Sequence, residues 1–90
     1  MVIPWDEPKR AINLRTHGLD FEDIESGFDW DTALVAPSHP GRDGRMRFPM
    51  LGYLDGKLRA VVFSPLGNEA ISVISLRPVS RKERKSYAEA

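Results

Sequence analysis

Hydrophobic and polar residues recur with a helical period over the first third of the chain. Asp6 is a good N-cap, and Pro8 fits a first turn because its missing N–H is not needed there. Gly18 supplies the left-handed residue that closes a helix, so the pattern predicts a first helix from Asp6 to about His17. The apolar residues 1–5 before it predict a short strand.

The first helix is expected to carry a polar stripe opposite its packing face. Successive residues are 100° apart around a helix, which sorts these side chains onto two sides. The expected packing face is formed by Ala11 and Leu14, and the polar stripe by Lys9, Asn13, Thr16 and His17.

A second helix and a first strand follow. Phe21, Ile24 and Phe28 recur at i, i+3 and i+7, which predicts a helix over 21–28. Residues 32–36 are strand-like, and the Pro- and Gly-rich residues 37–44 predict a loop.

From Arg45 onward the period falls to two, which predicts antiparallel strands. Pro49 cannot donate to a ladder, so the first of these strands is expected at an edge or at a bulge. Asp-Gly within "LDGK" predicts a two-residue type I′ hairpin that leads into a strand over 58–64. The run 70–77 is apolar on both sides in its middle, which suits a central strand.

The end of the chain carries a helix signal. Ser80 followed by Glu83 forms a capping box, which predicts a C-terminal helix. The whole pattern predicts one α+β domain over residues 1–90, with a mostly antiparallel sheet, two N-terminal helices and one C-terminal helix.

Composition narrows the functional classes. The chain has no cysteine, which excludes disulfides and thiolate metal sites and favours a reducing cytoplasm. No run approaches the ~18 apolar residues of a membrane span, and the N-terminus does not resemble a signal peptide. With two histidines and no metal-ligand spacing, we expect neither a metal nor another cofactor.

Charge is unevenly spread although the net charge is zero. The first 31 residues carry eight acidic and three basic residues, and the remainder carries ten basic and five acidic ones. A polyanion could therefore bind the basic part. Arg47 and Arg77 each adjoin an apolar strand, and guanidinium groups suit phosphate; the alternative is that these arginines pair with the acidic residues of the first 31.

Four further side chains each have two interpretations. His17 could complement the dipole at a helix end or could shuttle protons, since histidine changes charge near neutral pH. Glu83 could be a capping partner or a proton carrier, and Tyr87 could pack or take part in proton transfer. Trp5 could lie in the core or stack on a base.

Six stretches together resemble the BrnT-type toxins of type II toxin–antitoxin operons: "WDEPKRAINLRTHGLDF", "FDWD", "RFPMLG", "AVVFSPLG", "ISVISLR" and "SRKERKSY". The joint match of W-D-x-x-K-x-x-x-N-x-x-x-H-G-x-x-F with S-x-R and E-R-x-x-Y extends from Trp5 to Tyr87. The resemblance implies a RelE-like fold and a ribonuclease activity that arrests translation. It also implies a cognate BrnA-type ribbon-helix-helix antitoxin, in a heterotetramer that binds operator DNA through the antitoxin.

By this resemblance the chain is expected to be a metal-independent endoribonuclease. Charge stabilisation is assigned to Arg47 and Arg77, and proton transfer to His17 with Glu83 or Tyr87. Lys9 and Ser75 would hold phosphate, and Trp5 would stack on a base. The full RNA-binding set is expected to be Trp5, Lys9, Asn13, Ser75, Arg81 and Arg84.

The chain departs from the family pattern at a few positions. Family members commonly have a basic residue where Thr16 stands, acidic residues where Arg45 and Met46 stand, and often an arginine at the place of Ser72. These departures keep a second hypothesis open, in which the chain retains the toxin fold without catalysis. It would then act only by pairing with an antitoxin and regulating its operon.

Overall fold

The predicted α+β fold class is confirmed. A computed structural model describes residues 5–36, 39–40, 46–66 and 70–90. The elements are α1 (Glu7–His17), α2 (Glu22–Gly27), β1 (Leu34–Val35), β2 (His39–Pro40), β3 (Met46–Leu54), β4 (Lys57–Leu66), β5 (Ala70–Pro78) and α3 (Arg81–Glu89). Residues 1–4 of the predicted first strand lie outside the described residues. Trp5 forms an isolated parallel bridge with Val73 of β5.

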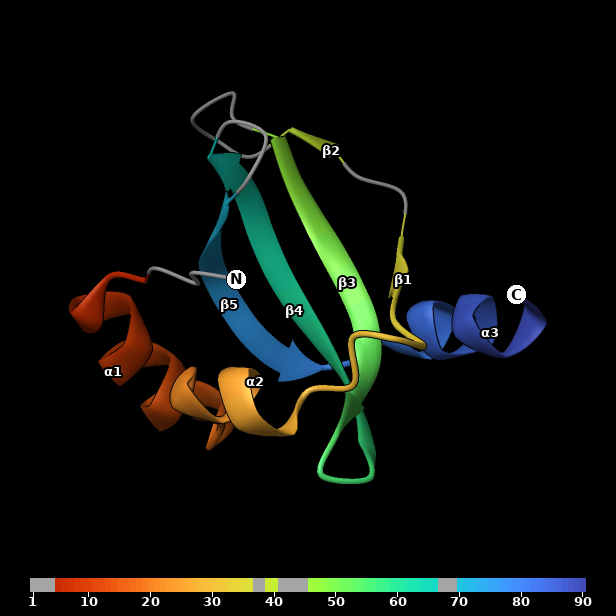
Figure 1. The fold of residues 1–90 in the computed structure, drawn as a ribbon, viewed down its shortest axis with the longest axis horizontal. Helices are drawn as coiled ribbons and strands as arrows, with labels where there is room; N and C mark the ends of the chain where they lie inside the picture. The colour runs from red at the N-terminus through yellow and green to blue at the C-terminus, as the bar shows by residue number, and fades with distance from the viewer. Residues whose placement is uncertain (1–4, 37–38, 41–45, 67–69) are drawn as a thin grey trace.

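The sheet is antiparallel and strongly twisted (Figure 1). Its order is β1-β3-β4-β5, and β2 also pairs with β3. The predicted hairpin joins β3 to β4, with Asp55 at φ 51° and Gly56 at φ 81°, as a type I′ turn requires. The loop predicted for 37–44 is wrong at His39 and Pro40, which pair with β3. Residues 37–38 and 41–44 of that loop lie outside the described residues.

Pro49 is accommodated by an interruption in the neighbouring strand. Its carbonyl accepts a hydrogen bond from the Ala36 N–H at 2.8 Å, so its backbone faces the side of β3 that carries β1 and β2. β1 ends at Val35 and β2 begins at His39, and the missing N–H of Pro49 falls in this interval. β3 is therefore not an edge strand, as one alternative had it: β4 pairs with it from Phe48 to Leu54 on one side, and the short strands β1 and β2 pair with it on the other.

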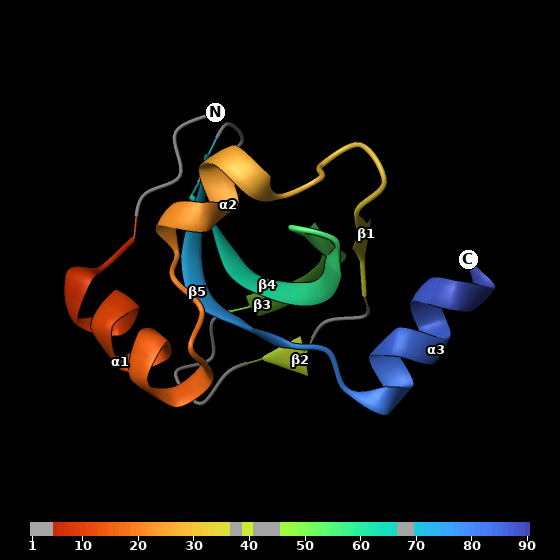
Figure 2. The same cartoon turned by 90° about the horizontal axis from the view of Figure 1, so that it is seen from below.

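The apolar core lies between α2 and one face of the sheet. α1 and α3 lie at opposite sides of the other face (Figure 2). The predicted helical triplet is buried there with residues of the three long strands: Phe21, Ile24, Phe28, Leu54, Val61, Val73 and Leu76. The Phe28 ring lies so close to Gly52 that a Cβ at Gly52 would come within 2.6 Å of it. A glycine is therefore required at that point of β3.

α1 has the predicted ends but the opposite packing face. It follows Asp6, whose side chain makes no capping hydrogen bond, and it ends before Gly18, which has φ 69°. Leu14 is 45% exposed and Ala11 is also exposed, whereas Asn13 is 5% exposed and is the buried residue of this helix. The prediction of a packing face at Ala11 and Leu14 is therefore wrong, because α1 faces the sheet with its polar stripe.

The Asn13 side chain docks α1 onto the outer edge of β5. Its Nδ2 donates to the Leu76 carbonyl at 2.8 Å, and its Oδ1 accepts from the Leu76 N–H at 3.1 Å. The carboxamide thus pairs with Leu76 as the peptide group of an adjacent strand would. Together with the bridge at Trp5 it covers an edge that would otherwise present unpaired backbone groups. Within the described sheet β5 is thus an edge strand, and the prediction of a central one is wrong.

Replacement of Asn13 should destabilise the fold far more than replacement of its apolar neighbour. In Asn13→Ala the buried N–H and C=O of Leu76 lose their partners, which should lower the free energy of unfolding by about 2–4 kcal/mol. Leu14→Ala serves as the matched control and should cost less than about 1 kcal/mol, since that side chain is half-exposed. Urea denaturation measures both, and the reverse ranking would show that α1 packs through its apolar side.

Candidate functional site

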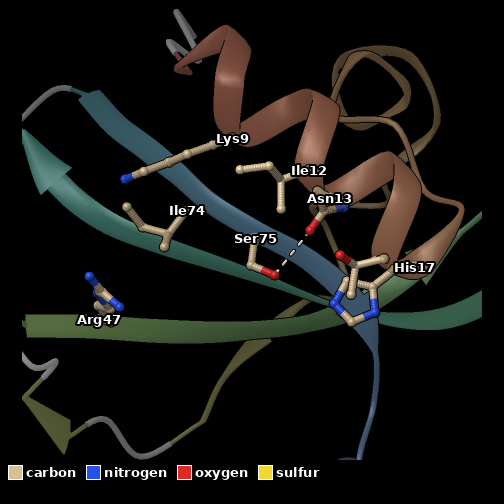
Figure 3. Close-up of a pocket in the computed structure, with 8 residues that line it drawn as sticks. Lys9, Ile12, Asn13, His17, Arg47, Ile74 and Ser75 are labelled. Carbon is tan, nitrogen blue, oxygen red and sulfur yellow. Dashed lines mark hydrogen bonds between the residues drawn. The ribbon is translucent and has the colours of Figure 1, made fainter.

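A cleft of about 330 Å³ lies between α1 and the face of the sheet that α2 does not cover (Figure 3). α1 contributes most of its lining, and β3 and the bulged part of β5 contribute the rest. The lining residues are Lys9, Ile12, Asn13, Thr16, His17, Arg47, Ile74 and Ser75. Five of the residues predicted to form a functional site therefore meet here: Lys9, Asn13, His17, Arg47 and Ser75.

A β-bulge in β5 shapes the floor of the cleft. Val62 pairs with Ser75, but the next residue of β4, Phe63, pairs with Val73. Ile74 is therefore the extra residue, and it lines the cleft together with Ser75. Bulges redirect side chains in this way. The apolar run of β5 contained no signal for it.

The titratable side chains on the cleft come from two separate elements. Lys9 and His17 extend from exposed positions on α1, and Arg47 is half-buried on β3. Within the described residues, the side chains of Lys9 and His17 make no hydrogen bond or ion pair. Gly18 ends α1 directly after His17, which leaves the imidazole at the rim of the cleft (Figure 3).

Asn13 lines the cleft, but all its hydrogen-bonding capacity is used within the protein. Besides its two bonds to Leu76, Nδ2 donates to the Leu19 carbonyl at 2.9 Å. Oδ1 also accepts from the Ser75 hydroxyl at 3.1 Å. A carboxamide has two N–H donors and two acceptor lone pairs, so none remains for a ligand. The geometry gives Asn13 a structural role in place of the RNA contact expected from the sequence.

Arg77 and Glu83 form a bidentate ion pair outside the cleft lining. The Arg77 Nη1 and Nη2 atoms lie 2.7 and 2.9 Å from the two carboxylate oxygens of Glu83. This pair joins the end of β5 to the start of α3, and the predicted capping box with Ser80 is also present. The alternative that Arg77 pairs with an acidic residue of the first 31 is thus wrong.

The ion pair controls the protonation of Glu83. Hydrogen bonds from Arg77, with a further one from the Ser80 N–H, lower the pKa of Glu83 to about 2 although burial opposes this shift. The same contact raises the pKa of Arg77. Glu83 is therefore ionised near neutral pH and has no proton to donate there.

The remaining predicted residues lie away from the cleft. The Tyr87 hydroxyl donates to the Thr32 carbonyl at 3.0 Å, and its ring meets Tyr53 edge-on at 5.8 Å. Trp5 packs edge-on against Phe21 at 6.3 Å, which places it beside the core. Two predicted RNA contacts, Arg81 and Arg84, are exposed on α3 and do not line the cleft.

Arg10 forms ion pairs that the sequence pattern did not predict. It donates to both carboxylate oxygens of Asp20 at 2.7 and 3.1 Å and also pairs with Glu7 and Glu22. These contacts hold α1 to the start of α2, and they lower the pKa of Asp20. The sequence signal for these ion pairs was the position of a basic residue within the acidic first third of the chain.

A second, apolar cleft of about 240 Å³ lies between β1 and α3. Its lining residues are Leu34, Val35, Ala36, Leu51, Ser86, Tyr87 and Ala90.

Within the described ranges no three His, Asp or Glu side chains are grouped so as to hold a metal ion. In the same ranges no helix is long and apolar enough to cross a membrane.

The chain is similar to a described protein family and to a solved structure of a member of that family. Residues 5–83 match the family described as "Ribonuclease toxin, BrnT, of type II toxin-antitoxin system". The crystal structure of the Brucella abortus ribonuclease toxin, BrnT, at 1.1 Å resolution superposes with a TM-score of 0.66 at 43% identity, over 88% of this chain and 96% of that chain. A comparison with curated proteins gave no match. The match spans nearly all of the described fold, so the chain belongs to the BrnT family of ribonuclease toxins of type II toxin–antitoxin systems.

Proposed function

We propose that this chain is a toxin that cleaves RNA internally without a metal ion and thereby inhibits translation. The observation that carries the proposal is the meeting of Lys9, His17 and Arg47 on one cleft. Lys9 and Arg47 are basic side chains, which suit a phosphodiester, and the imidazole of His17 suits proton transfer.

The proposed reaction uses the ribose itself as the nucleophile. The 2′-oxygen attacks the adjacent phosphorus while the bond from phosphorus to the 5′-oxygen breaks, which leaves a 2′,3′-cyclic phosphate. His17 accepts the proton of the attacking hydroxyl, and the Lys9 ammonium is the candidate to protonate the departing 5′-oxygen. Arg47 stabilises the negative charge on the phosphoryl oxygens of the transition state.

Arg77 and Glu83 take a different part in this proposal from the one expected at first. Their mutual ion pair occupies the guanidinium and keeps the carboxylate ionised, which suits the attachment of α3 better than catalysis. The contacts of Tyr87 with Thr32 and Tyr53 also attach α3.

The proposed partner is a BrnA-like ribbon-helix-helix antitoxin, in a heterotetramer that binds operator DNA through the antitoxin. The cationic cleft suits an acidic segment of that partner, which would cover the RNA site. The acidic residues of α2 offer a competing surface for a basic segment.

A second candidate function is a non-catalytic toxin fold that acts only through antitoxin pairing. One observation favours it: Thr16, where a basic residue is expected in the family, lines the cleft and leaves it one cation short. Growth arrest upon expression without a partner separates the two functions, because only a catalytic chain arrests growth.

RNA cleavage by the purified chain should persist in excess EDTA. The proposed chemistry needs no metal ion, so the products should carry a 2′,3′-cyclic phosphate or the 3′-phosphate derived from it. Mass spectrometry of the fragments identifies these ends. Cleavage that stops in EDTA and returns with magnesium would contradict the proposed mechanism.

Arg47 and Arg77 should differ when replaced by alanine. Arg47→Ala should lower the cleavage rate by about 10²–10³-fold, which is the usual effect of removing a transition-state donor. Arg77→Ala should instead lower the melting temperature and leave cleavage nearly unchanged at temperatures where the variant is folded, because its partner is Glu83. Cleavage assays and thermal melts of both variants test this, and a loss of activity in Arg77→Ala alone would restore its catalytic role.

The Arg77–Glu83 pair should also make stability depend on pH. The pKa of Glu83 lies below its ordinary value of 4.5, at about 2, so its stabilising effect is complete above the ordinary value and is lost as pH falls towards the lower one. The drop in melting temperature between neutral pH and about pH 3 should therefore be smaller in Glu83→Gln than in the parent chain. Asp20 is present in both proteins, so its own contribution cancels.

Antitoxin binding should depend on the cleft if the antitoxin masks the RNA site. Charge reversal at Lys9 and Arg47 should then weaken the complex as well as cleavage, and bound antitoxin should raise the melting temperature. A matched reversal on α2, at Glu22, Asp23 and Glu25, should leave affinity unchanged. Titration calorimetry measures both, and the opposite pattern would place the antitoxin on α2.

A further inference from the structure

The hydrogen-bonding direction of Ser75 is fixed by Asn13. Both N–H groups of the Asn13 carboxamide donate to backbone carbonyls, one of Leu19 and one of Leu76, so the amide cannot turn over without breaking both bonds. Its Oδ1 therefore faces Ser75 and has no hydrogen to give. The Ser75 hydroxyl must be the donor in the 3.1 Å bond between them.

This arrangement leaves Ser75 as an acceptor towards the cleft. A serine hydroxyl has one hydrogen, and here that hydrogen points to Asn13, so only oxygen lone pairs remain for a ligand. A phosphodiester oxygen carries no hydrogen near neutral pH and would meet Ser75 lone pair to lone pair. The geometry thus disfavours the phosphate contact expected from the sequence.

A ribose hydroxyl supplies the hydrogen that Ser75 lacks. We propose that Ser75 accepts a hydrogen bond from a ribose 2′-hydroxyl and so favours RNA over DNA at this cleft; this inference rests on the proposed function. The hydroxyl belongs to a nucleotide beside the attacking one, because the attacking hydroxyl transfers its proton to His17. The 2′-hydroxyl is the group by which a protein distinguishes the two nucleic acids at a given site.

The side chains of the cleft would then contact different parts of a nucleotide. Lys9 and Arg47 donate, and they suit the phosphate groups. Ser75, fixed as an acceptor on the bulge of β5, suits the sugar. Figure 3 shows Ser75 between the α1 side chains and Arg47, where a nucleotide would contact both kinds of group.

Nucleotides that cannot be cleaved test the proposal. Adenosine 5′-monophosphate and adenosine 3′-monophosphate, each with its 2′-deoxy counterpart, carry phosphate monoesters and give no reaction. We expect the parent chain to bind a ribonucleotide about threefold to tenfold more tightly than its deoxy counterpart, the effect of one hydrogen bond. In Ser75→Ala this preference should disappear, while the affinity for inorganic phosphate stays unchanged. Chemical-shift titration measures all these affinities.

Ser72→Ala is the matched control, since Ser72 lies on the same strand but does not line the cleft, and it should keep the preference. Equal affinity of the parent chain for the two sugars would overturn the proposal, even if Ser75→Ala failed to fold. An equal loss of affinity for phosphate and for every nucleotide in Ser75→Ala would also overturn it, because Ser75 would then be a phosphate donor. After either of these two outcomes, RNA cleavage by the parent chain would still support the proposed function. If the parent chain neither cleaved RNA nor bound nucleotides, the proposed function and the role of Ser75 would both be contradicted.

Discussion

The hydrogen bonds of Asn13 are the interaction on which the rest of the structure depends. Apolar contact usually docks a helix onto a sheet, but here a carboxamide pairs with the backbone of Leu76 in a buried position. Hydrogen bonds are directional, so this contact fixes the rotation of α1 as well as its position. That rotation brings Lys9 and His17 over the sheet, and the same carboxamide sets the direction of the Ser75 hydroxyl. The fold and the candidate site therefore share one set of bonds.

Local signals in the sequence predicted the elements well, and long-range ones were missed. The hairpin at Asp55, the capping box at Ser80 and the end of α1 at Gly18 each depend on a few neighbouring residues, and each is confirmed. The packing face of α1 and the edge position of β5 depend on a bond between residues 63 positions apart. Hydrophobic periodicity does not detect such a bond, because it treats a polar side chain as an exposed one. The bulge at Ile74 was missed for a similar reason, since it is a matter of register between two strands.

The family motif indicated candidate site residues without separating their roles. Eight of these candidates lie in separate parts of the structure. Lys9, His17, Arg47 and Ser75 meet on the cleft, Arg77 and Glu83 connect β5 to α3, and Trp5 and Tyr87 pack at two other places. A pattern of letters records that these positions go together, whereas only distances show which of them could touch one substrate.

The orientation of α1 has a consequence for how this chain can change in evolution. Ile12 and Leu14 flank Asn13 and are exposed, so mutation can replace them with little effect on folding. Asn13 has no equivalent substitute: aspartate lacks the two N–H groups, glutamine is one methylene longer, and histidine cannot donate and accept side by side. Among related chains we therefore expect apolar positions of this helix to vary while its central polar one stays constant. Selection at this position would act on the placement of the carboxamide nitrogen and oxygen rather than on hydrophobicity.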